Sequence, residues 1–146
     1  MSLNKYPRTP HATTGGIVYF ARLIDKVRLH AAGELHPDLV ANLGIFFDKR
    51  CCDFLRVEYP ALVAAVTNNT LDDEAALAWC FANGRKPSDE EIEIWNAFMS
   101  KRGWRDAGTP TLVKRKAENG FEARDDIRTM FDYIDADEGR PVKNYA

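Results

Sequence analysis

Hydrophobic residues recur every three or four positions along most of the chain, which is the spacing of a helix that buries one face. In the first such set Phe20, Leu23 and Val27 share a face, and this predicts a helix from about Gly16 to Ala32. Alternation with a period of two is rare, and no hairpin dipeptide separates two β-branched runs. The pattern therefore predicts an all-α fold, whose further helices begin near Pro37, Phe47, Tyr59, Asp72, Ser88, Thr109 and Asp125.

These helices are individually short, so tertiary packing must stabilise them. We expect a single compact domain over residues 1–146, built from about six to eight short helices. Residues 1–14 are predicted to be an extended N-terminal segment, because Pro7 and Pro10 push the residues before them toward extended conformations. Residues 140–146 are predicted to be a polar tail.

Three helix starts carry specific capping signals. Ser88 is followed three residues later by Glu91, which is the pattern of a capping box. Asp72 is placed to cap the helix that ends at Gly84. At Thr109-Pro110 a hydroxyl N-cap precedes a proline in the first helical position.

Composition excludes several classes of protein without indicating an activity. The 146 residues are 45% hydrophobic and 29% charged, which is ordinary for a globular domain and unlike disordered, collagen-like or membrane chains. The N-terminal residues 1–16 are polar, with two prolines, and lack the apolar stretch of a signal peptide. Three cysteines without a C-x-x-C pair indicate core-filling thiols in a reducing compartment, so we expect a cytoplasmic protein.

The net charge of −2 conceals two opposed blocks. Residues 101–116 contain six basic residues and one acidic residue, a net of +5, whereas residues 118–138 contain two basic and eight acidic residues, a net of −6. The blocks are predicted either to neutralise each other within the fold, or to do so between the two subunits of a homodimer, or to be solvated faces.

Motifs that identify an enzyme class are missing from the chain. Gly15-Gly16 precedes a helix, but no phosphate-binding glycine motif follows it. No histidine or cysteine pair has the spacing of metal ligands, so we expect no metal and no cofactor. A nucleophile and its base cannot be assigned, and the catalytic residues, if any, stay unknown.

The most distinctive stretch runs from Ile94 to Asp106 and joins a helix end to a loop rich in arginine and tryptophan. Lys101 and Arg102 suit the negative end of a helix dipole. Trp104 and Arg105 follow the glycine that ends the helix, where helix formation does not require them. This loop is predicted either to clamp a carboxylate or phosphate, or to pin itself to the acidic final helix.

Several short blocks resemble the bacterial family known as domain of unknown function 5069, and they span nearly the whole chain. The blocks are YPRTP at 6–10, GGI at 15–17, RLIDKVR at 22–28, DFL at 53–55, IWN at 94–96, FDYID at 131–135 and GR at 139–140. The family's DFL is often followed by glycine, whereas Arg56 follows it here, so that helix end is expected to differ. The resemblance implies a bacterial domain and names no reaction.

The resemblance draws attention to Arg22, Asp25 and Lys26, which share one face of the first predicted helix. Our leading hypothesis is a non-catalytic binding or regulatory module for a small anion or a protein partner, without nucleic-acid or membrane binding. The alternative is a small cofactor-independent enzyme that uses Asp25 or Asp132 as acid and base beside Arg22 or Lys26. The candidate ligand- or partner-binding residues are Arg22, Asp25, Lys26, Trp95, Asn96, Arg102, Trp104, Arg105 and Asp132.

Overall fold

The structure, a computed structural model, describes residues 4–142, and the end of the expected polar tail lies outside this range. The described part is mostly helical, which confirms the predicted fold class. Two short strands precede seven α-helices and one 3-10 helix. They are β1 (Thr13–Thr14), β2 (Ile17–Val18), α1 (Phe20–Ala31), η1 (Pro37–Asn42), α2 (Phe47–Leu55), α3 (Tyr59–Asn69), α4 (Asp73–Asn83), α5 (Asp89–Lys101), α6 (Thr109–Glu118) and α7 (Met130–Asp137).

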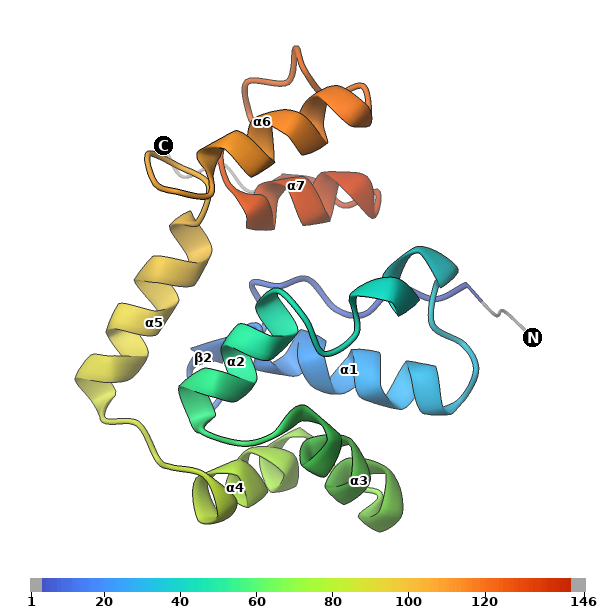
Figure 1. The fold of residues 1–146 in the computed structure, drawn as a ribbon, viewed down its shortest axis with the longest axis vertical. Coiled ribbons are helices and arrows are strands. Elements are labelled where there is room, and N and C mark those ends of the chain that lie inside the picture. Colours follow the sequence, from blue (N-terminus) through green and yellow to red (C-terminus); the bar gives the residue numbers. More distant parts are fainter. Residues whose placement is uncertain (1–3, 143–146) are drawn as a thin grey trace.

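Helix α1 lies at the centre of the molecule (Figure 1). Helices α3 and α4 pack against it on one side, and α2 packs against α3. The long helix α5 contacts β2 at its side and carries the chain to the pair formed by α6 and α7 (Figure 1). The last two helices therefore face α1, η1 and α2 across the middle of the molecule.

The main hydrophobic core forms around α1. Phe20, Leu23 and Ile24 are fully buried, and Phe131 of α7 joins the same cluster. The three cysteines are buried and free, which confirms their prediction as core-filling thiols. A smaller cluster of Leu112, Ile127 and Tyr133 holds α6 against α7, with partly buried residues around it. Burial of these faces stabilises helices that are too short to persist alone.

The prediction that the first helix begins at Gly16 is wrong. Thr13 pairs with Val18, and Thr14 pairs with Ile17, in a two-stranded antiparallel hairpin. Gly15 and Gly16 form its turn at φ values of +56° and +77°, which glycine adopts without a steric penalty. The helix begins only at Phe20, after the hairpin.

Side chains of α5 hold this hairpin in place. The indole Nε1 of Trp95 donates to the carbonyl oxygen of Val18 at 3.1 Å. The amide of Asn96 donates to the Gly16 carbonyl oxygen at 2.7 Å and accepts from the Val18 amide at 3.0 Å. These contacts come from residues far along the chain, so local sequence could not reveal the hairpin.

Two of the three capping predictions are confirmed, and one is corrected. The Ser88–Glu91 capping box is present, and Asp72 caps α4. Gly108, rather than Thr109, is the N-cap of α6, because the Thr109 hydroxyl donates to the Gly103 carbonyl oxygen instead.

The last helix begins at Met130 rather than near Asp125. Thr129 and Asp132 form a second capping box at this start. Where the family often has glycine, Arg56 caps α2 in the left-handed conformation at φ +58°. The helix thus ends directly after DFL despite the missing glycine.

Candidate functional site

A pocket of about 450 Å³ lies between α1, η1 and α2 on one side and α6 and α7 on the other. Charged and aromatic side chains make up much of its lining. The basic lining residues are Arg22, Lys26, Arg50, Arg102 and Arg115, the acidic ones are Asp38, Asp137 and Glu138, and the aromatic ones are Tyr19, Phe46, Phe47 and Tyr133. A cavity of this size suits a small organic ligand.

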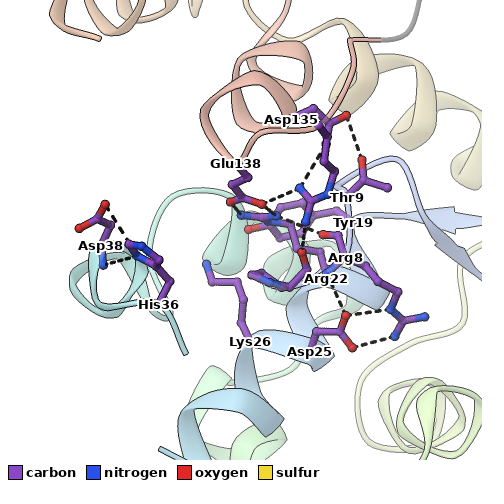
Figure 2. A network of polar contacts seen from close by, with 12 residues as sticks. Arg8, Thr9, Tyr19, Arg22, Asp25, Lys26, His36, Asp38, Asp135 and Glu138 are labelled. Carbon is purple, nitrogen blue, oxygen red and sulfur yellow. Dashed lines mark hydrogen bonds and ion pairs between the residues drawn. The ribbon is translucent and has the colours of Figure 1, made fainter. Parts of the chain in front are cut away.

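Arg22 and Glu138 join α1 to the end of α7 at one wall of the pocket (Figure 2). The guanidinium donates to both carboxylate oxygens, at 2.8 Å and 2.5 Å, and both side chains are almost fully buried. Arg140 donates to the same carboxylate at 2.6 Å. Burial is the largest single influence and lowers the pKa of Arg22, but the hydrogen bonds to Glu138 together with the electrostatic effects of Tyr19, Glu138 and Asp48 outweigh it, so the pKa is raised overall.

Lys26 lies one turn further along α1 and also lines the pocket. Its Nζ is 2.9 Å from Oδ1 of Asp48, which is fully buried. The Tyr19 hydroxyl donates to the same oxygen at 2.6 Å, and the Gly44 amide donates to Oδ2 at 3.0 Å. Burial lowers the pKa of Lys26 although Asp48 opposes this, and burial together with the charge of Asp48 raises the pKa of Tyr19 well above its usual value.

Arg50 of α2 and Arg102 after α5 are two neighbouring positive charges that line the pocket. Their guanidinium carbons lie 5.0 Å and 5.3 Å from the ring centroid of Phe98, so both stack on one aromatic side chain. Burial lowers the pKa of Arg50, and so does the positive charge of Arg102, although the negative charge of Asp106 opposes both effects. Asp106 lies 3.7 Å from Arg102, whereas Arg50 forms no ion pair with any residue in the range 4–142. Two neighbouring guanidiniums that share one nearby carboxylate can bind a further anion, such as the carboxylate or phosphate group of a ligand.

Three of the nine predicted site residues line this pocket, namely Arg22, Lys26 and Arg102. Two others have structural contacts elsewhere. Asp25 binds Arg8, at 2.8 Å and 2.9 Å, and so holds the N-terminal segment against α1. Asp132 accepts the backbone amides of Arg128 and Thr129 at the start of α7.

Trp104 and Arg105 do not line the pocket. The Arg105 guanidinium stacks on the Trp104 ring at 5.2 Å, and both residues are exposed. Arg105 has a φ of +52°, which is the left-handed region. Trp95 and Asn96 bind the hairpin, as described above. The structure thus separates Arg102 from the rest of the predicted arginine and tryptophan loop.

Sequence reasoning missed Tyr19, Asp48, Arg50 and Glu138. One signal was available for Asp48, because it shares the helical spacing of Cys51, Cys52 and Leu55, which form the buried face of α2. A carboxylate on a buried face needs a partner, and Lys26 supplies it. Nothing in the spacing of the other three pointed to a pocket.

Both charged blocks contribute residues to the lining of the pocket. Arg102 and Arg115 come from the basic block, and Asp137 and Glu138 come from the acidic block. Within residues 4–142 a single ion pair joins the blocks, between Lys114 and Glu118 at 3.9 Å. Direct neutralisation within the fold is therefore slight.

Among residues 4–142 no group of three or more histidine, cysteine or acidic side chains is arranged to hold a metal ion. Within the same range no helix has the length and apolar character needed to cross a bilayer.

The fold and the pocket define a mostly helical protein with a charged cavity between its central helix and its last two helices. The sequence profile of the family described as Domain of unknown function (DUF5069) matches residues 4–140, and the chain belongs to that family. The comparison with curated proteins gives no match.

Proposed function

We propose that the protein is a binding or regulatory module for a small organic anion, with a carboxylate or phosphate group, and that the pocket is its site. The observation that carries the proposal is the pair Arg50 and Arg102, which stack on Phe98 and which, among residues 4–142, form a single ion pair, from Arg102 to Asp106. Burial is the larger cause of the lowered pKa of Arg50, and a ligand anion beside the guanidiniums would offset the second cause, the positive charge of Arg102.

The remaining lining supports an organic ligand rather than a bare ion. Phe46 and Ile45 are exposed apolar residues at the pocket, with 64% and 43% of their surfaces accessible. They offer apolar surface to the body of a ligand whose anionic group lies at the arginines. Arg115 is exposed on α6 and adds a third positive charge to the lining.

Isothermal titration calorimetry with phenyl phosphate tests the proposal, because this probe joins one phosphate to one apolar ring. Replacing one charged, bidentate arginine contact costs about 1.5–3 kcal/mol, so R50Q should weaken binding by about 10- to 100-fold. R102Q should weaken it similarly. The fold of both variants is checked by circular dichroism.

The matched control is R105Q, which removes an arginine from the exposed loop outside the pocket. This variant should bind phenyl phosphate as the parent does. A loss of affinity in R105Q but not in R50Q would place the anion at the loop and refute the pocket. Undetectable binding to the parent at millimolar concentration would refute the proposal for aryl phosphates.

A further inference from the structure

Lys26 is a buried lysine whose side chain lines the pocket. It lies on the face of α1 that points toward the end of α7, as does Arg22 (Figure 2). Its side chain is only 5% exposed, so reagents can approach it mainly through the pocket. Exposed lysines such as Lys49, which is 66% exposed and also paired with an aspartate, offer a direct comparison.

The partner of Lys26 is placed to exchange a proton with it. Asp48 Oδ1 lies 2.9 Å from Nζ, and the Tyr19 hydroxyl and the Gly44 amide fix the orientation of the carboxylate. Burial favours the neutral form of the amine and lowers its pKa, and the nearby charge of Arg22 acts in the same direction. A neutral amine is the nucleophilic form of lysine.

We propose that Lys26 forms an imine with a small carbonyl compound that bears an anionic group, of the class of 2-oxo acids and phosphorylated aldehydes. This inference rests on the proposed function, because the arginines of the pocket would hold the anionic group. The lysine would supply a nucleophilic amine, which a pocket that only binds anions lacks.

The step balances without another reactant. The Lys26 ammonium gives one proton to Asp48, and the nitrogen lone pair attacks the carbonyl carbon to form the C–N bond. The carbonyl oxygen takes a second proton from nitrogen, which yields a carbinolamine. The proton held by Asp48 then passes to the hydroxyl, the C–O bond breaks, and water leaves as nitrogen forms the double bond. The products are a protonated imine and one water molecule.

Reductive trapping with glyoxylate and cyanoborohydride at pH 7 tests this step. Each trapped imine becomes a carboxymethyl group on lysine, which peptide mass spectrometry locates. We expect Lys26 to be labelled faster than Lys49, because burial lowers the pKa of Lys26 whereas the hydrogen bond to Asp53 raises the pKa of Lys49. K26R keeps a cation beside Asp48, and this variant should lose the fast label while staying folded.

Two further measurements assign the role of the arginines. Phenyl phosphate should protect Lys26 from glyoxylate and leave Lys49 labelling unchanged. R50Q should slow labelling of Lys26 by glyoxylate and should not slow labelling by acetaldehyde, which has no anionic group. Equal slowing with both aldehydes would overturn the requirement for an anionic group.

The outcomes separate the two proposals. If phenyl phosphate binds but Lys26 is labelled no faster than Lys49, the imine is refuted and the anion site stands. If phenyl phosphate does not bind and Lys26 is still labelled fast by both aldehydes, the anion site is refuted and a reactive lysine is supported. A merely structural Lys26 would show slow labelling under every condition.

Discussion

Replacing Asp48 by asparagine removes the carboxylate that compensates Lys26 and leaves the shape of the side chain almost unchanged. The carboxylate accepts three donors, from Lys26, Tyr19 and the Gly44 amide. An asparagine offers one accepting oxygen and one donating NH₂ group. In either orientation of the amide, the NH₂ group therefore points at one of the donors that the carboxylate had accepted. We expect D48N to be strongly destabilised.

The size of the loss follows from two arguments. Removing one partner of a buried ion pair costs about 3–5 kcal/mol. Lys26 can avoid an uncompensated charge by losing its proton. Deprotonating an amine of ordinary pKa 10.5 at pH 7 costs about 5 kcal/mol, because each pH unit below the pKa adds about 1.4 kcal/mol. The two figures agree, and we expect the free energy of unfolding to fall by about 3–5 kcal/mol.

This loss should depend on pH in a defined direction. In D48N the pKa of Lys26 in the folded state falls further below its unfolded value, so the unfolded chain binds more protons. Stability therefore rises with pH in the variant, and the gap to the parent narrows by up to about 1.4 kcal/mol per unit between pH 7 and pH 9. Urea unfolding followed by circular dichroism at several pH values measures both effects.

The exposed pair Lys49–Asp53 provides the control. Its atoms are 2.7 Å apart, but the side chains are 66% and 62% exposed. Solvent screens such an exposed pair, so D53N should change stability little at any pH. A loss below about 1 kcal/mol in D48N, with the same pH dependence as the parent, would refute the reasoning.

Three other substitutions have defined outcomes. Phe46 has a φ of +53° at the pocket, so F46G should raise stability by about 1 kcal/mol in urea unfolding while weakening phenyl phosphate binding; lower stability would show that its packing outweighs the strain. Arg56 caps α2 in the left-handed region, so R56G should stabilise the protein by about 0.5–1 kcal/mol, whereas R56A should not. E138Q leaves Arg22 buried without its full counter-charge, and its thermal midpoint should fall by about 10 °C; an unchanged midpoint would exclude this pair as the main link between α1 and α7.

The candidate site was only partly accessible from sequence. The family resemblance and a shared helix face drew attention to Arg22 and Lys26, and the arginine- and tryptophan-rich stretch drew attention to Arg102. Their partners Glu138 and Asp48 lie more than 20 residues away along the chain, and no periodic pattern relates such positions. Trp95 had the same local signals as a binding residue, but its indole holds the hairpin instead.

The sequence by itself determined that this protein is mostly helical and where most of its helices begin, because helical spacing and capping are local properties of neighbouring residues. It also determined that opposed charges are concentrated toward the C-terminal end. Only the tertiary structure decided that α6 and α7 face α1 across a pocket, and that Arg50 and Arg102, which line this pocket, both stack on Phe98. The physical reason is that pockets and charge compensation arise from contacts between distant segments, which local sequence patterns do not encode.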